Sequence, residues 1–332
     1  MTASKQPVAA APVATVPLVS ASWLSRYGTL ATLVLLILFN IIFTPNFLSF
    51  QTLNVNLTQV APIVIVAIGM TLVIATGGID LSVGSLMAIS GALAPMIFLG
   101  TIMPMPSAAL GVALALVLPI LVTAALGWFN GMLITRYAIQ PIVGTLVLFI
   151  AGRGIAQVMT NGNLQTFTNG AFQYIALGRI AGIPVQVVLM AIVVAAAAWL
   201  IRRTVLGRQI LAVGGNEKAA RLAGIPTVRV KRLVYTISGA LAGLAGLIVV
   251  ARNSASDANL VGLGMELDAI AAVAVGGTLL AGGRANIVGT LLGACVIQLV
   301  RYTLLANGVP DAAALVVKAA LIVLAVFIQQ KA

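Results

Sequence analysis

The side chains that usually carry catalytic or metal chemistry are scarce in this chain. It has no histidine, a single cysteine, Cys295, and six acidic residues among 332. Histidine metal sites, histidine-dependent triads and imidazole proton relays are therefore excluded. No Gly-Lys dipeptide occurs, so there is no Walker A phosphate loop. We expect no metal site, no cofactor and no catalytic residue in this chain, and one cysteine permits no internal disulfide.

The scarcity of charge points to a membrane protein. Apolar residues make up 61% of the chain and charged residues 7%, against roughly 45–50% and about 25% in soluble domains. A spanning helix needs about 20 apolar residues, which predicts an all-α, polytopic integral membrane protein with about ten transmembrane helices. The predicted spans lie near residues 27–43, 57–76, 84–100, 108–134, 140–160, 181–201, 233–251, 265–282, 286–306 and 312–328.

Basic residues set the predicted orientation. The segment 202–232 holds eight lysines and arginines against one acid, Glu217, and such a segment is hard to translocate, so we expect a cytoplasmic loop. Six spans precede it and four follow, which places both termini in the cytoplasm. Residues 1–22 are predicted to form a disordered tail without a cleaved signal peptide, and residues 23–332 one transmembrane domain. Loop topology explains the net charge of +12 better than nucleic-acid binding does.

One acidic residue stands alone within the apolar region. Asp80 is the only charged side chain between Tyr27 and Arg136. A carboxylate at the bilayer centre costs about 2.5–3.5 kcal/mol on insertion scales, so we expect Asp80 at the cytoplasmic edge or satisfied within a broken helix. Two adjacent glycines before it weaken a helix, and the acid can cap the next one. This helix-break motif comprises Gly77, Gly78, Asp80, Ser82 and Gly84.

The helix-break motif has more than one interpretation. The plainest is a capped hinge that holds the second and third spans, with Asp80 and Ser82 accepting free amide hydrogens of the third span. A gate, a contact with a partner protein and a contact with substrate are the alternatives. A proton relay is disfavoured because a relay needs several titratable groups in series, and none lies nearby in the sequence.

A short helix is predicted inside the basic segment. Asn216 suits its N-cap, and Glu217 complements the positive dipole of the first turn. Gly224 fits the left-handed backbone conformation that often ends a helix, and Pro226 prevents the helix from continuing. So short a helix is marginal alone in water, so something must pack against it. Docking into a groove of another protein and resting on lipid headgroups are the two interpretations, and the small apolar groups available are Ala219, Ala220, Leu222, Ala223 and Ile225.

Three separated segments resemble the permease subunits of ribose-type ATP-binding-cassette sugar importers. The first runs from Ala67 to Gly84, and the second from Met265 to Ala272, followed by Gly276-Gly277 and Gly282-Gly283-Arg284. The third, from Gly215 to Ile225, resembles the ATPase-coupling loop of that family. The likeness extends from about residue 30 to 328. Two shorter strings, Ala151 to Gln157 and Asp257 to Asn259, are more similar to galactofuranose permeases than to ribose permeases.

The resemblance implies the partners of the chain. These are cytoplasmic ATPase subunits, a second permease copy or homologue, and a soluble sugar-binding protein in the periplasm or outside the cell. A bacterial cytoplasmic (inner) membrane location follows, with membrane lipid and a monosaccharide, ribose-like or galactofuranose-like, as ligands and no nucleic acid. The residues that the resemblance assigns to ATPase coupling are Gly215, Asn216, Glu217, Ala219, Ala220, Arg221 and Gly224.

Charged groups are also expected in the outer half of the membrane. Glu266 and Asp268 are predicted to open the eighth span, where the helix dipole favours first-turn acids. Arg301 and Lys318 lie in later spans, and we expect at least one of them to pair with either acid, because unpaired charges are costly there. Arg153 either ends a short fifth span or lines a wet cavity.

Polar residues in or beside the spans are candidates for the sugar path. Each of them is also explained by a hydrogen bond to a neighbouring helix. The candidates are Asn56, Gln59, Thr71, Asn130 and Gln157. The loop 161–179, with Phe167, Phe172 and Tyr174, is either a landing surface for the sugar-binding protein or an interfacial helix.

The predicted function is a permease subunit that alternates between outward and inward openings, driven by ATP hydrolysis on a separate subunit. The alternative is an ion-gradient-driven secondary carrier for a small polar solute, which would place a coupling charge near the midplane. A membrane enzyme is disfavoured, since the chain offers neither a nucleophile–base pair nor a metal constellation.

Overall fold

The computed structural model describes residues 21–102, 104–310, 312–313, 315–317, 319–320 and 323. Residues 1–20 of the predicted tail and much of the predicted span 312–328 lie outside the described residues. The helices are α1 (Ala21–Phe43), α2 (Phe50–Ala75), α3 (Val83–Phe98), α4 (Ala108–Arg136), α5 (Pro141–Met159), α6 (Gly170–Leu177), α7 (Val185–Arg203), α8 (Val205–Gly215), α9 (Glu217–Leu222), α10 (Thr227–Asn253), α11 (Met265–Val275) and α12 (Ile287–Ala306).

Four two-residue strands complete the described elements. Strand β1 (Gln165–Thr166) pairs antiparallel with β4 (Ala255–Ser256), and β2 (Arg179–Ile180) pairs antiparallel with β3 (Ile183–Pro184). The β1–β4 pair joins the loop after α5 to the stretch after α10, with Gln165 opposite Ser256.

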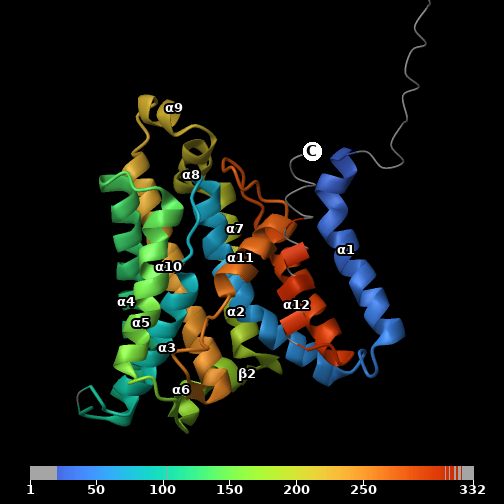
Figure 1. The fold of residues 1–332 in the computed structure, drawn as a ribbon, viewed down its shortest axis with the longest axis vertical. Helices are drawn as coiled ribbons and strands as arrows, with labels where there is room; N and C mark the ends of the chain where they lie inside the picture. The colour runs from blue at the N-terminus through green and yellow to red at the C-terminus, as the bar shows by residue number, and fades with distance from the viewer. Residues whose placement is uncertain are drawn as a thin grey trace, which may run out of the picture.

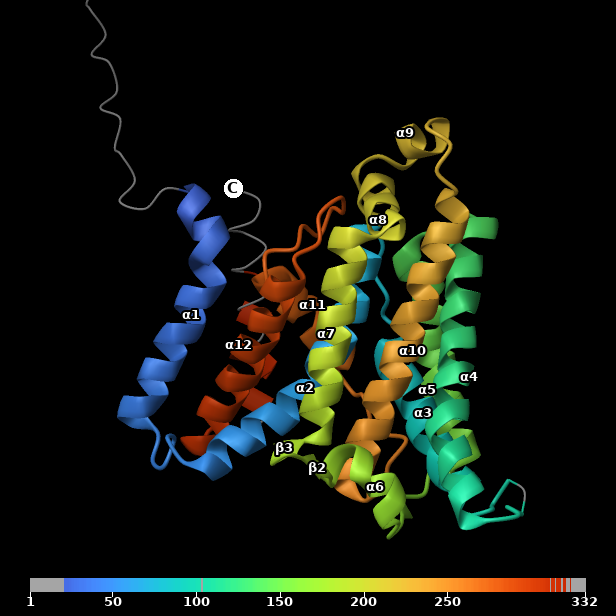
Figure 2. The ribbon, with the colours of Figure 1, turned by 180° about the vertical axis from the view of Figure 1, so that it is seen from behind.

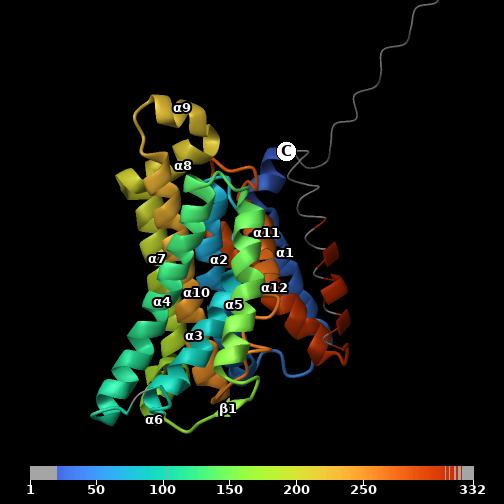
Figure 3. The same cartoon turned by 60° about the vertical axis from the view of Figure 1, so that its left-hand side comes forward.

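The long helices form a bundle with two distinct ends. Helices α8 and α9 lie at one end, here named the α9 end, and α6 lies at the other, the α6 end (Figures 1 and 2). Helices α4 and α5 lie side by side on one flank, and α1 lies on the opposite flank, against α12 (Figures 1 and 3). Among the described residues, six helices are long and apolar enough to cross a membrane: α2, α4, α5, α7, α10 and α12.

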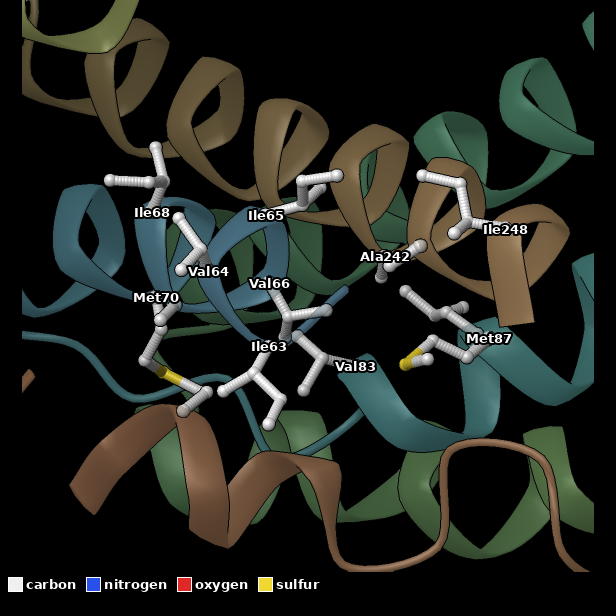
Figure 4. Close-up of a cluster of buried hydrophobic side chains, with 14 of the residues drawn as sticks. Ile63, Val64, Ile65, Val66, Ile68, Met70, Val83, Met87, Ala242 and Ile248 are labelled. Atoms are coloured by element: carbon white, nitrogen blue, oxygen red, sulfur yellow. The ribbon is translucent and has the colours of Figure 1, made fainter. Parts of the chain in front are cut away.

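Helix α2 is the centre of the bundle. It packs against α7, α10, α11 and α12, and every residue from Val60 to Ala75 is buried. Val66 of α2, Met87 of α3 and Ala242 of α10 lie in one apolar cluster (Figure 4). In a membrane the lipid is as apolar as these side chains, so close packing rather than removal from water holds them together.

Small residues allow a close contact between α4 and α10. A Cβ atom added to Gly239 of α10 would lie 3.1 Å from the Cα of Gly127 on α4 and would overlap the Thr123 carbonyl oxygen. The two backbones therefore touch without intervening side chains, as small residues permit in membrane helices.

Helices α3 and α11, here called the two short helices, are too short to cross a membrane alone. Helix α3 has 16 residues and α11 has 11, or about 24 and 16 Å at 1.5 Å per residue, against a hydrocarbon core of about 30 Å. An unwound stretch, residues 76–82, precedes α3 and runs inward from the α9 end (Figure 1). Another, residues 254–264, precedes α11 and includes β4. Unwound backbone at this depth is tolerated because protein surrounds it.

The predicted eighth span is partly wrong. Residues 265–282 were expected to be one helix, but α11 ends at Val275 and residues 276–286 form a glycine-rich hairpin before α12. Gly277, Gly282 and Gly283 have positive φ angles, a conformation that glycine adopts readily.

Candidate functional site

Asp80 is satisfied within the unwound stretch. The residue is fully buried, its Oδ1 accepts hydrogen bonds from the Ser82 amide (3.1 Å) and hydroxyl (2.6 Å), and its Oδ2 accepts one from Ser238 Oγ of α10 (2.8 Å). A buried carboxylate needs such donors to offset the loss of water. The expectation of an acid satisfied within a broken helix is confirmed.

The expected capping role of this motif is wrong. Ser82 occupies the N-cap position of α3 but makes no side-chain capping hydrogen bond. Asp80 binds Ser82 and Ser238 rather than the free amides of α3. The carboxylate therefore joins the unwound stretch to another helix instead of ending its own.

The stretch around Asp80 is tied to three helices. Asn130 of α4 donates to Ser82 Oγ (2.9 Å), and Thr145 of α5 accepts from the Leu81 amide (3.2 Å). The Tyr235 hydroxyl of α10 donates to the Ile79 carbonyl (3.4 Å). Movement of α10 relative to α4 and α5 must therefore change this network.

The first two resembling segments meet Gly214, the residue just before the third, at the α9 end, in a cluster here named the glycine junction (Gly77, Gly214, Gly282 and Gly283). The Gly283 amide donates to the Ala75 carbonyl (3.0 Å). A Cβ atom on Gly282 would lie 2.9 Å from both the Gly77 nitrogen and the Gly214 oxygen, and one on Gly214 would overlap the Ala75 oxygen. The end of α8, the end of α2 and the 276–286 hairpin thus pack backbone to backbone.

The predicted capped helix is confirmed as α9. The Asn216 side chain accepts from the Ala219 amide (3.0 Å), Gly224 has φ +80°, and the Ile225 amide donates to the Ala220 carbonyl (3.0 Å). These are the contacts of an N-cap and of a left-handed C-terminal stop.

The exposed face of α9 differs from the predicted one. Ala220 is only 5% exposed and belongs to the hydrophobic core, whereas Leu222 is 90% exposed. The expectation that Ala220 offers its methyl group to another protein is wrong, because the helix turns that residue inward. The side chains on the outer face are those of Lys218, Ala219, Arg221, Leu222 and Ala223.

Helix α9 is held to α10 by an ion pair. Lys231 Nζ lies 2.5 Å from Glu217 Oε2, and Arg221 lies 3.5 Å from the other oxygen of the same carboxylate. The Lys231 side chain is 16% exposed and that of Arg221 67%. Helix α10 also contacts α4 through Arg232, whose Nε donates to Thr135 Oγ1 (2.9 Å). One unbroken helix therefore connects α9 to the Asp80 network.

The beginnings of the two short helices meet in the interior. Gly84 of α3 lies so close to Gly262, before α11, that a Cβ on either would overlap the other's carbonyl oxygen; one on Gly84 would also lie 2.5 Å from Glu266 Oε2. Glu266 and Asp268 lie in the first turn of α11, as predicted, and both are buried.

Arg153 stabilises the stretch before α11. Its Nη1 donates to the carbonyls of Ala258 (2.8 Å) and Val261 (2.6 Å), and it interacts electrostatically with Glu266. Helix α5 continues to Met159, so the interpretation of Arg153 as the end of a span is wrong. The pairing predicted for Arg301 or Lys318 stays a prediction, since Lys318 lies outside the described residues.

The five predicted path residues are dispersed. Each donates a hydrogen bond to protein or accepts one: Asn56 to Thr52, Thr71 to Ala67, Asn130 to Ser82, Gln157 to Asn259, and Gln59 from Gln298. The Thr71 hydroxyl also lies 2.8 Å from that of Thr290. Sequence reasoning missed Ser238, Arg252 and Gln298. Their partners are distant in the sequence, and no local pattern marks them.

The aromatic loop at the α6 end is mostly folded inward. Phe167 and Phe172 are buried against Phe98, with ring centroids 5.1 and 5.0 Å from it. Tyr174 on α6 is 52% exposed. A landing surface made of the two phenylalanines is therefore wrong.

Comparison with known proteins identifies relatives along most of the chain. Residues 52–326 match the family model described as "Branched-chain amino acid transport system / permease component". The ribose import permease RbsC of Escherichia coli K12 is 43% identical over 314 residues, 93% of this chain and 95% of that protein. The galactofuranose transporter permease YtfT of the same organism is 42% identical over 282 residues, which cover 83% of this chain and 78% of that protein.

A third relative, the fructose import permease FruF of Bifidobacterium longum, is 39% identical and covers 76% of this chain and 70% of that protein. No solved structure matches. The arrangement described above, with its unwound stretches and glycine junction, is therefore read from this structure alone.

Proposed function

Because the chain belongs to this family of transport-system permease components, we propose that it translocates a monosaccharide through an ATP-driven importer of the bacterial cytoplasmic membrane. Relatives named for the import of ribose, galactofuranose and fructose support the sugar class. The partners proposed with it are separate ATPase subunits, a second permease copy or homologue, and a soluble sugar-binding protein.

The proposed topology has about ten spans, with the α9 end and both termini in the cytoplasm. The six long helices supply six of them. Helix α1, the two short helices with their unwound stretches, and residues 312–328 would supply the rest. The basic residues of segment 202–232, which contains α8 and α9, support this orientation.

One observation supports the mechanism more than any other: α10 carries both Lys231, which binds Glu217 of α9, and Ser238, which binds Asp80. Movement of an ATPase bound to the exposed face of α9 would displace α10. This displacement would reach the Asp80 network through the same helix, and the glycine junction would transmit it to α2 and the 276–286 hairpin. The proposed role of segment 202–232 is therefore ATPase coupling.

Burial of Asp80 favours a second candidate function. Carboxylates in broken helices near the midplane serve as ion-coupling groups in secondary carriers, and Asp80 is fully buried in such a stretch. Its two hydroxyl donors, Ser82 and Ser238, nevertheless account for its oxygens without a bound ion.

Reconstitution distinguishes these functions. The chain would be assembled in liposomes with its genomically neighbouring ATPase and binding protein, and uptake of labelled D-ribose, D-fructose, L-arabinose and D-galactose measured. We expect uptake that requires ATP and the binding protein and stops when the Walker A lysine of the ATPase is replaced. Uptake by this chain alone, driven by a sodium or proton gradient, would establish the carrier instead.

A further inference from the structure

A cavity lined by five polar and five apolar residues lies between four helices on the side of the α6 end. It has a volume of about 230 Å³ and is lined by residues of α2, α10, α11 and α12. Its position follows from the early part of α2 and the late parts of α10 and α12, all of which lie toward the α6 end (Figures 1 and 2). Its polar lining comprises Gln59, Arg252, Asp268, Gln298 and Arg301.

The lining offers hydrogen-bond donors and acceptors together. Gln298 Nε2 donates to Gln59 Oε1 (2.6 Å), so the amide group of Gln59 and the carbonyl of Gln298 can still bind a ligand. Arg252 uses one N–H on the Thr58 carbonyl (3.3 Å), and a guanidinium carries five. Asp268 contributes carboxylate oxygens. Hydroxyl groups both donate and accept, so a polyhydroxylated ligand matches this mixture.

Charged side chains inside a membrane protein cost free energy, and their presence around this cavity therefore indicates a function. Three charged groups and two amides from four helices converge in a part of the protein that the proposed topology places within the bilayer, where charged residues mark substrate pathways. The volume is below the roughly 300–1,000 Å³ of pockets for drug-sized ligands, which suits a monosaccharide-sized solute better than a larger one.

We propose that this cavity is a sugar subsite on the outer part of the translocation path, in which Gln59, Gln298 and Asp268 bind sugar hydroxyls. The proposal rests on the proposed function and extends it to named residues. Arg252 lies on α10, the helix that carries Lys231 and Ser238 toward its other end. A shift of α10 would therefore move one wall of the subsite, which couples sugar release to the ATPase.

A matched pair of variants tests the subsite. Gln298→Leu removes an amide from the cavity and breaks its 2.6 Å bond to Gln59. Gln186→Leu removes an amide of the same size, also from a buried side chain, and breaks a 3.0 Å bond to the Ala176 carbonyl, away from the cavity. In the reconstituted importer we expect Gln298→Leu to raise the KM for sugar about tenfold, the scale of one or two lost hydrogen bonds, while Gln186→Leu changes it less than about twofold.

Thiol labelling tests the subsite without removing a polar group. Leu305 lines the cavity and is 46% exposed, so Leu305→Cys in a Cys295→Ala background places one reactive thiol there. We expect the sugar that the unaltered importer carries to slow labelling by a membrane-impermeant methanethiosulfonate at least about threefold. A thiol placed at Leu99, which is 55% exposed and outside the lining, is the control and should label at an unchanged rate.

The outcomes separate this inference from the proposed function. If the unaltered importer carries no sugar, the proposed function fails. If it carries sugar, but Gln298→Leu has an unchanged KM, or sugar leaves labelling of Leu305→Cys unchanged, only the subsite fails. Protection by inorganic phosphate or anionic lipid instead of sugar also overturns the subsite, since the two arginines would then bind an anion. Where Gln298→Leu does not assemble, the labelling experiment decides.

Discussion

Ser238 Oγ on α10 donates a 2.8 Å hydrogen bond to Oδ2 of Asp80, in the unwound stretch between α2 and α3. Both residues are buried. The bond joins a helix that begins beside α9 to the one acid of the N-terminal apolar region. The Ser82 hydroxyl, the Ser82 amide and the Ser238 hydroxyl all donate to the carboxylate, and these hydrogen bonds offset its burial.

Replacement of Ser238 should weaken this connection. Ser238→Ala leaves Asp80 Oδ2 without its hydroxyl donor, which costs about 1–3 kcal/mol for a buried polar group. We expect a lower melting temperature in detergent and slower ATP-driven uptake, measured on the same preparation. Ser238→Thr keeps the hydroxyl and serves as the control; a Ser238→Ala protein with unchanged melting and uptake would contradict the finding that this bond matters.

Two replacements of Asp80 separate its charge from its hydrogen bonds. Asp80→Asn keeps one oxygen that accepts from the Ser82 donors. It also adds an amide N–H group from which Ser238 Oγ can accept a hydrogen bond, so we expect a mild defect in uptake. Asp80→Leu leaves all these donors unpaired and should cost at least about 2 kcal/mol more. Melting temperature and uptake rate report the difference. Equal and complete loss of uptake in both variants would show that the charge itself is needed, as in an ion-coupled carrier.

Local features of the sequence were predictive where neighbours in the chain determine the structure. The cap at Asn216, the stop at Gly224 and the first-turn position of Glu266 follow from rules that span four residues. The break after Ala75 was likewise indicated by two adjacent glycines. These features were confirmed because each depends on backbone conformation near the residue itself.

Contacts between distant segments were not predictable in the same way. Gly77, Gly214 and Gly282 carry no side chain whose periodicity would reveal a common junction, and Ser238 lies among other small residues of α10. The inward turn of Ala220 is determined by packing against the rest of the chain, which a six-residue helix does not encode. Apolar residues also continue past Val275, which concealed the end of α11.

The exposed face of α9 should bind the ATPase. Leu222→Asp places a charge on a side chain that is 90% exposed, so we expect normal insertion and melting but loss of ATPase co-purification and at least about a tenfold drop in uptake, the effect of a lost interface anchor of about 1.4 kcal/mol or more. Ala220→Glu instead buries a charge and should lower the melting temperature as well. Normal uptake by a well-inserted Leu222→Asp protein would contradict docking through this face.

Adjacent glycines offer a matched test of the glycine junction. A Cβ on Gly214 would overlap the Ala75 oxygen, whereas one on Gly215 would meet nothing within 4 Å. We expect Gly214→Ala to lower the unfolding free energy by about 1–3 kcal/mol, as overpacking does, and to slow uptake. Gly215→Ala should leave the unfolding free energy unchanged or raise it slightly, because alanine favours the helix. Equal behaviour of the two variants would mean that the junction tolerates a side chain.

The ion pair between Glu217 and Lys231 should transmit force between α9 and α10. Each charge reversal alone, Glu217→Lys or Lys231→Glu, sets like charges against each other and should reduce ATP-driven uptake with little change in membrane insertion. The double reversal restores the attraction, so we expect recovery of most of the lost rate, and a coupling energy from the double-mutant cycle of about 1 kcal/mol given partial exposure.

Arg221→Ala is the control for this cycle. Arg221 is bound to the same carboxylate at 3.5 Å, but its side chain is 67% exposed, and a pair of this kind within one helix is worth about 0.3–0.5 kcal/mol. Its removal should therefore lower the unfolding free energy little, and a loss of uptake in this variant would report contact of the guanidinium with the ATPase rather than the link to α10. Failure of the double reversal to recover uptake, with both proteins inserted and bound to the ATPase, would show that α10 follows α9 through backbone contacts rather than through this pair.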